Sequence, residues 1–160
     1  MSQYNLLPVP YETEKNLSAE TIGRETSPIL YKNGISFDYK TGDFVRNAKN
    51  RLIDSDGVEN WRSWCINCIQ TNRYRHLAYS HNFGIDMDSV FEADSPKEAE
   101  SVLIREITEA LLADPYQRTD YISNIDITWE TPDSVKVYVV IQGKDNVTID
   151  ITAYLTKGGL

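Results

Sequence analysis

WRSWCINCIQ, residues 61–70, is the stretch that decides the fold of this chain. Its apolar side chains recur at the spacing of one helix face, at i, i+3, i+4, i+7 and i+8: Trp61, Trp64, Cys65, Cys68 and Ile69. Just before it, Asp56 and Glu59 stand three residues apart, as in the capping box that begins many helices. The stretch therefore predicts an amphipathic helix with two tryptophans on its buried face.

An aromatic loop follows this helix. Residues 71–84, TNRYRHLAYSHNFG, are too irregular for a strand and end in a glycine, which can take a positive φ angle. We expect the aromatic side chains to pin the loop to the domain, and Val90 and Phe91 to close it. Three of its side chains could serve either to pin the loop or to contact another protein: Tyr74, Arg75 and Tyr79.

A second helix is predicted to begin at Ser95-Pro96-Lys97-Glu98, which has serine at the N-cap and proline at the first helical position. Its predicted apolar face consists of Ala99, Leu103, Ile107, Ala110 and Leu111, widened by Val102 and Ile104. Its predicted solvent face consists of Glu100, Arg105, Glu106 and Glu109. Asp114-Pro115 ends the helix.

The last forty residues alternate apolar and polar side chains in three runs. The apolar sides are Tyr121, Ser123, Ile125, Ile127 and Trp129 in the first run; Val135, Val137, Val139 and Ile141 in the second; and Val147, Ile149, Ile151, Ala153 and Leu155 in the third. Turn residues 132–133 and 143–146 separate the runs. This pattern predicts a three-stranded antiparallel meander with the two helices on one face, which is an α+β fold of two layers.

The third strand, Val147 to Leu155, is expected to lie at an edge of this sheet. An edge strand has unpaired backbone groups, which a protein either shields or uses to pair with another chain. Val147, Ile149 and Ile151 are therefore candidate partner-binding positions.

The N-terminal third has a different character. Residues 1–27 contain prolines and glutamates without an apolar period, and we expect an extended arm that is either mobile or laid across the domain. In residues 28–56, Ile35, Phe37 and Tyr39 alternate with polar residues before a turn at 41–43, which predicts a hairpin followed by a polar connection over 47–55. The main domain is then residues 57–160.

Composition excludes some classes of function. The chain has 160 residues and a formal charge of −8, which argues against nucleic acid and anionic membranes as partners. No apolar run approaches the roughly 20 residues that cross a bilayer, and no basic, apolar leader is present. We expect a soluble protein that stays inside the cell that makes it, and two cysteines suit such a reducing compartment.

Two kinds of chemistry compete with purely structural explanations. Cys65, Cys68, His76 and His81 have the spacing C-x2-C-x7-H-x4-H, which defines a zinc-binding module as one alternative. The cysteines lie in the tryptophan stripe, however, and the gap of seven is shorter than the roughly twelve residues of a common zinc finger. The carboxylates around Glu92 suggest a hydrolase as another alternative, but the chain has 24 acidic residues, so such a cluster is expected by chance. We therefore expect no enzyme activity, metal or other cofactor.

The order of these motifs resembles the baseplate wedge and sheath-initiator proteins of contractile phage tails. In that family an amphipathic helix and a polar loop end in Phe-Gly, then come a Phe-Glu pair, a second helix closed by Glu-Pro-Arg, and strands. The resemblance covers residues 57–155, and the hairpin points to the XkdS-type branch of PBSX-like prophages and tail-derived bacteriocins. Matching positions in this chain are Phe83-Gly84, Phe91-Glu92 and Asp114-Pro115, with Tyr116 in place of the family's arginine and Arg118 as a substitute.

The resemblance implies a structural baseplate protein, in a phage virion or a bacteriocin particle assembled in the bacterial cytoplasm. The expected partners are the tail sheath protein and baseplate wedge proteins, with tube or hub proteins as further candidates. The corner at Tyr116 and Arg118 would contact wedge proteins, and the strands would pair with sheath strands as in the handshake domain of the sheath protein. Some members carry a lysozyme-like label, so a cell-wall hydrolase stays open as an alternative.

Overall fold

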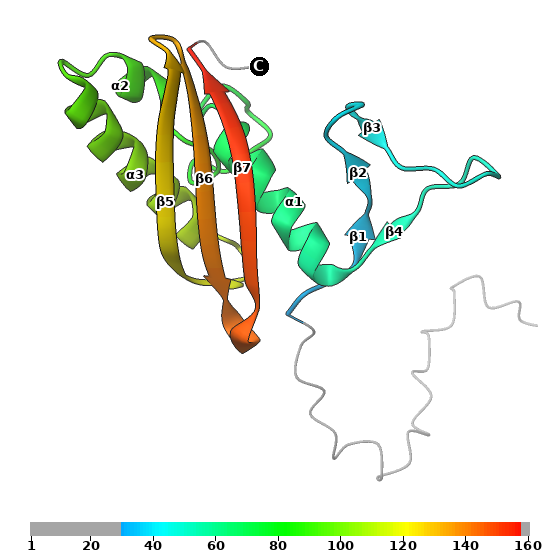
Figure 1. Ribbon diagram of the computed structural model, residues 1–160. Helices are drawn as coiled ribbons and strands as arrows, with labels where there is room; N and C mark the ends of the chain where they lie inside the picture. The colour runs from blue at the N-terminus through cyan, green and yellow to red at the C-terminus, as the bar shows by residue number, and fades with distance from the viewer. Residues whose placement is uncertain (1–29, 158–160) are drawn as a thin grey trace, which may run out of the picture.

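The computed structural model describes residues 30–157 and has two layers (Figure 1). Three long strands form an antiparallel sheet in the order β5-β6-β7, with bounds Thr119–Thr131, Ser134–Gly143 and Thr148–Thr156. Helices α1 (Gly57–Gln70) and α3 (Pro96–Leu112) cover one face of this sheet (Figure 1). The predicted α+β fold is confirmed. The expected arm, residues 1–27, lies outside the described residues.

The hydrophobic core lies between the helices and the inner face of the sheet. β6, the central strand, alternates along its whole length, and the inward side chains of β6 and β7 are buried: Val135, Val137, Val139, Ile141, Ile149, Ile151, Ala153 and Leu155. The faces predicted for these two strands are confirmed. Val147 precedes β7, next to a 3-10 turn at Lys144–Asn146, and is only half-buried.

The face predicted for β5 is wrong at its start. Ile122 pairs with Ile141, and Asn124 pairs with the residue just before Ile141, so Ser123 is an extra residue in the ladder. Such a bulge reverses which side chains point inward. Ile122 therefore packs against the core, whereas Tyr121 and Ser123 are exposed. Farther along the strand, the predicted inward positions at Ile125, Ile127 and Trp129 are confirmed.

Both long helices begin as predicted. The Asp56 carboxylate accepts a hydrogen bond from the Glu59 amide at 2.8 Å, and the Ser95 hydroxyl accepts one from the Glu98 amide at 3.3 Å. On α1 the predicted stripe is buried at Trp61, Cys65, Cys68 and Ile69, with Trp64 half-buried at its margin. Capping and periodicity therefore placed these helices correctly, because both depend on neighbours within a few residues.

On α3 the predicted faces are wrong at two positions. Ile104 is 42% exposed, because it lines an open groove between α3 and the edge strand β5. Glu106, predicted to face solvent, is only 5% exposed. A short helix that was not predicted, α2 (Met87–Phe91), precedes α3. Its five residues are too few to show a helical period.

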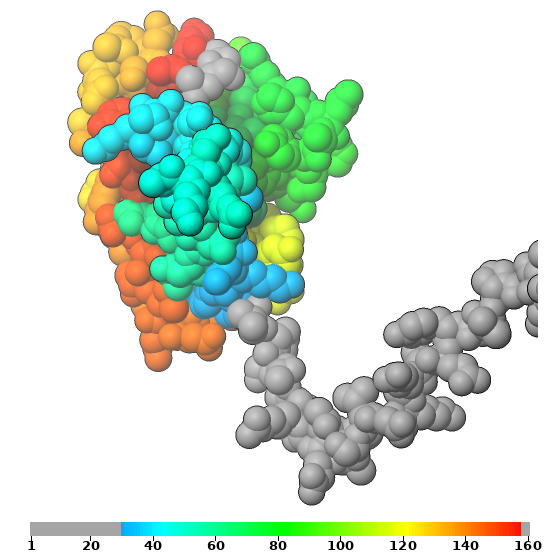
Figure 2. All heavy atoms as spheres, turned by 90° about the vertical axis from the view of Figure 1, so that its right-hand side faces the viewer, coloured from blue at the N-terminus to red at the C-terminus, as the bar shows by residue number. Residues whose placement is uncertain are grey.

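The segment before α1 forms two short antiparallel pairs. β2 (Phe37–Asp38) pairs with β3 (Asp43–Phe44), which confirms the hairpin, and β1 (Gly34–Ile35) pairs with β4 (Asp54–Ser55). β4 lies in residues 47–55, so the polar connection predicted there is partly wrong. The Tyr39 hydroxyl ties this segment to α1 by donating to the Ser63 carbonyl at 3.1 Å. Figure 2 views the molecule from the side on which this segment projects.

None of the helices within residues 30–157 is both long enough and apolar enough to span a bilayer.

Candidate functional site

The aromatic loop is closed by backbone hydrogen bonds at its base. The Arg73 amide donates to the Ile85 carbonyl at 2.8 Å, and the Ile85 amide donates to the Thr71 carbonyl at 3.0 Å. Gly84 takes a φ of +92°, and a Cβ there would lie 2.6 Å from the Thr71 carbonyl oxygen. Only glycine suits this position, because both the backbone angle and the space reject a side chain.

A buried ion pair holds the same loop against α3. A Glu106 carboxylate oxygen lies 3.4 Å from an Arg73 guanidinium nitrogen and accepts a hydrogen bond from the Asp86 amide at 3.1 Å. The Arg73 Nε donates to the Gly84 carbonyl at 2.9 Å. This pair was not predicted, because a glutamate on a helix is normally solvated. The only sign of this pair in the sequence was the position of Glu106 among the apolar residues of one helix face.

The tip of the loop is strongly exposed. Tyr74 is 69% exposed, Tyr79 is 52% exposed, and Leu77, which was not among the predicted contact residues, is fully exposed. The Tyr79 ring packs on Phe83 at 4.7 Å between centroids, and Phe83 packs on Trp64 of α1 at 5.8 Å. The loop is thus anchored through Phe83, while its tip presents apolar surface. Residues 71–85 contain arginines but no acidic residue, unlike the chain as a whole.

A second ion pair forms the corner between α3 and β5. The guanidinium of Arg118 donates two hydrogen bonds to Asp114, at 2.8 and 2.9 Å, and both residues are 3% exposed. The same carboxylate accepts hydrogen bonds from the backbone amides of Arg118 and Tyr116. The guanidinium also lies over the rings of Trp64 and Tyr116, at 5.5 and 5.1 Å. Arg118 is therefore part of the buried interior of the corner. Tyr116, which is 56% exposed, lies on the surface of the corner.

The third strand of the sheet has an open edge. Within residues 30–157, β7 pairs with β6 and with no other strand. The Gly143 amide donates to the Val147 carbonyl, and the Lys157 amide donates to the Asp133 carbonyl, at the two ends of the ladder. Because antiparallel hydrogen bonds alternate, these two bonds direct the odd-numbered amides of β7 toward β6. The even-numbered amides, from Thr148 to Thr156, face outward.

The other residues expected to meet partners fall into three groups by exposure. Glu92, Pro115 and Tyr116 are exposed, and Arg75 is exposed on the loop. The buried ones are Gly84, Asp114, Arg118, Ile149 and Ile151. Phe83, Phe91 and Val147 are half-buried. The side chains of Ile149 and Ile151 are buried in the core, where they fix the register of β7. A partner would therefore contact the backbone of β7 and not these two side chains.

The cysteines and histidines do not come together. Cys65 and Cys68 are completely buried in the core, whereas His76 and His81 are exposed on the loop. Burial raises the pKa of the Cys68 thiol to about 11 and holds that of Cys65 well above its usual value, whereas zinc binds thiolates. Among residues 30–157, no group of three or more His, Cys, Asp or Glu side chains is arranged to hold a metal ion.

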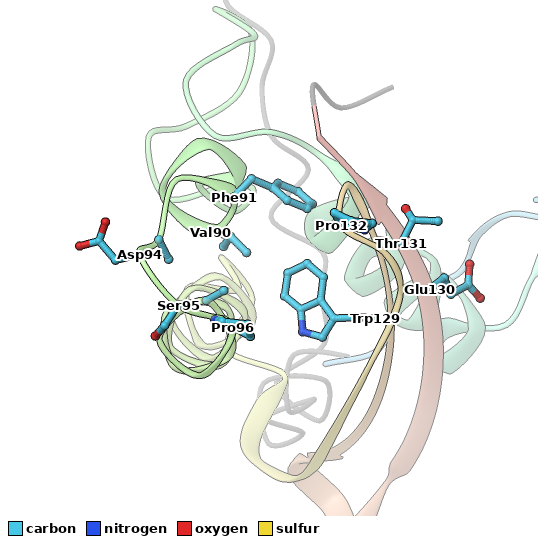
Figure 3. A pocket seen from close by; sticks show the side chains of 11 residues that line it. Val90, Phe91, Asp94, Ser95, Pro96, Trp129, Glu130, Thr131 and Pro132 are labelled. Carbon is cyan, nitrogen blue, oxygen red and sulfur yellow. The ribbon is translucent and has the colours of Figure 1, made fainter.

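An apolar groove lies beside the carboxylates that suggested hydrolysis. It has a volume of about 590 Å³ and runs between the α2–α3 connection and the β5–β6 turn. The rings of Phe91 and Trp129 meet in it edge to face, 5.9 Å apart, with Pro132 beside them (Figure 3). The carboxylates of Asp94 and Glu130 point away from it on opposite sides (Figure 3). Asp94 and Glu130 therefore do not converge on this groove, as hydrolysis there by two carboxylates would require.

Comparison with protein families gives one match. The family model described as contractile injection system sheath initiator matches residues 34–146, which is more than two thirds of the chain. A search of curated proteins finds no match.

Proposed function

Because the chain belongs to the sheath initiator family of contractile injection systems, we propose that it starts sheath assembly by pairing the open edge of β7 with a strand of the first sheath ring. The family has a structural role and implies a place in the tail or baseplate. The observation that carries the proposal is the outward row of amides and carbonyls on β7. Backbone hydrogen bonds along such an edge give affinity to an added strand.

One feature favours β7 over the other edge strand, β5. β7 keeps one register along its nine residues, from Thr148 to Thr156, whereas the β5 ladder is interrupted three times. Bulges twist an edge and block the addition of a further strand. An exposed ion pair between Arg62 of α1 and Asp150 of β7, 3.7 Å apart, lies near this edge. Displacing it costs only about 0–1 kcal/mol, which a new strand ladder can offset.

Thr152→Pro is expected to abolish binding to the sheath protein encoded in the same gene cluster. Thr152 lies in the middle of β7, its side chain is exposed, and its amide faces outward. Proline removes that amide and places a ring where the added strand would lie, yet proline is tolerated on edge strands. Binding would be measured by pull-down and by titration of the purified proteins.

Thr152→Val is the matched control, because valine keeps the amide and suits a strand. It should bind the sheath protein like the parent chain. Circular dichroism must give the same spectrum for both variants. Normal binding by a folded Thr152→Pro chain would reject pairing through β7.

We further propose that the loop tip and Tyr116 contact baseplate wedge proteins. The base of the loop is tied to α3 by the Glu106–Arg73 pair, and the corner is tied by Asp114–Arg118. A backbone that is ordered before binding loses less conformational freedom on association, which suits an interface surface.

Leu77→Asp is expected to weaken binding of a co-expressed wedge protein at least tenfold, because central apolar anchors contribute about 2 kcal/mol or more, which exceeds the roughly 1.4 kcal/mol of a tenfold change. Stability should change by less than about 0.5 kcal/mol, since the side chain is fully exposed. Ala78→Asp introduces the same charge next to it and should have a much smaller effect. Equal losses in the two variants would assign the effect to charge and not to the leucine.

A further inference from the structure

The apolar groove beside Trp129 has the chemistry of a site for an extended, proline-containing segment. The rings of Phe91 and Trp129, in contact with one another, line it together with Pro96 and Pro132 (Figure 3). Aromatic side chains at an angle to one another bind polyproline-II segments, because proline rings pack on their faces and little conformational entropy is lost. Its volume of about 590 Å³ is within the range of small ligand sites.

The chain itself contains such a segment. Residues 6–11 read LLPVPY, with two prolines separated by one residue and apolar side chains on both sides. Residues 1–11 contain no acidic side chain, whereas residues 12–25 contain Glu12, Glu14, Glu20 and Glu25. Only the first part of the arm is therefore apolar and uncharged enough to enter the groove. These residues lie outside the part of the chain that the structure describes.

The arm is long enough to reach the groove of its own chain. Its end is fixed at Tyr31, whose hydroxyl donates to the Lys144 carbonyl at 2.8 Å, at one end of β6. The groove lies at the other end of β6, whose 10 residues span about 33 Å. Pro10 stands about 21 residues before Tyr31, a stretch that spans about 65 Å as polyproline II.

The same tether favours binding within one chain over binding between chains. A flexible stretch of this length has a root-mean-square span of about 25 Å, which is comparable with the distance along β6. A short tether of matching span gives an effective concentration in the millimolar range. Purified protein is studied at micromolar concentrations, which are lower. The segment is therefore expected to bind the groove of its own chain in preference to that of another chain.

We propose that residues 6–11 bind in the Phe91–Trp129 groove of their own chain as a polyproline-II segment. The segment covers the apolar rings of this groove and holds the arm along the domain. Binding in the groove is independent of pairing through β7, which lies at another part of the surface.

The test uses the full chain with photoreactive benzoylphenylalanine in place of Tyr11. Irradiation should give crosslinks to the peptides that contain Phe91 or Trp129, identified by mass spectrometry after digestion. In a mixture of isotopically heavy and light chains, the crosslinks should stay within one chain. The substitutions Pro8→Gly and Pro10→Gly together should reduce their yield at least fivefold, because they remove the extended bias of the segment.

The control places the same photoreactive residue at Ser18, in the acidic part of the arm, where crosslinks to the groove should be few. The variant with both glycines should keep the circular dichroism spectrum of the parent chain. Crosslinks spread evenly over the domain, a yield that does not depend on the prolines, or crosslinks between heavy and light chains would each overturn the proposal.

Discussion

Asp114→Ala is expected to lower the free energy of unfolding by about 3–5 kcal/mol, the largest effect that we expect from a single substitution in this chain. The carboxylate accepts two hydrogen bonds from the Arg118 side chain and two from backbone amides, and it is almost wholly inaccessible to solvent. Its removal leaves a buried guanidinium without its partner. Urea denaturation followed by tryptophan fluorescence would measure the loss, since Trp64 lies against this guanidinium.

Two controls separate this effect from a general loss of charge. Arg62→Ala removes exposed ion pairs with Glu59 and Asp150 and should change stability by no more than about 1 kcal/mol. The double substitution Asp114→Leu and Arg118→Leu should regain much of the loss, because it leaves no buried charge unpaired. A loss below about 1 kcal/mol for Asp114→Ala would contradict a supporting role of the buried pair at the corner.

Glu106→Ala is expected to lower the free energy of unfolding by about 3 kcal/mol and to loosen the aromatic loop. The substitution leaves the Arg73 guanidinium, 12% exposed, without its closest carboxylate and deprives the Asp86 amide of its acceptor. Hydrogen exchange at the amides of Arg73 and Ile85 should become faster, because these amides form the base of the loop.

The matched control for Glu106→Ala is Glu109→Ala, one helical turn on along α3. Glu109 also lies near Arg73, at 4.0 Å, but its side chain is 56% exposed. Its loss should change stability by less than about 1 kcal/mol and leave exchange at the loop base unaltered. Similar exchange rates in the two variants would mean that the buried pair does not hold the loop. Binding of wedge proteins should fall with loosening of the loop if its tip is a contact surface.

Much of the fold was predictable from residues that are close together in the chain. The caps at Asp56 and Ser95 act within three residues, and the alternation along β6 and β7 needs only the strand itself. Edge strands follow from the order of the elements in a meander. The same local reasoning failed at Ser123, because a bulge depends on how two strands fit against the core and not on either strand alone.

The candidate surfaces were only partly predictable. Tyr74, Tyr79 and Tyr116 were singled out as contact residues and are exposed, but Leu77 was missed because a single leucine in a loop has no pattern around it. Arg118 was predicted as a contact residue but is buried against Asp114, because its guanidinium is used inside the corner. Which amides of β7 face outward depends on the register with β6, and that register cannot be read from the sequence of β7.

Local periodicity and capping were enough to establish two helices on a three-stranded sheet, and the motif order was enough to identify the family. Folding alone brings Glu106 to Arg73 and thereby gives the aromatic loop its fixed position. The reason is physical. A carboxylate on a helix is predicted to face water unless a charged partner offsets its desolvation, and in this chain that partner is Arg73, from the loop that precedes α2.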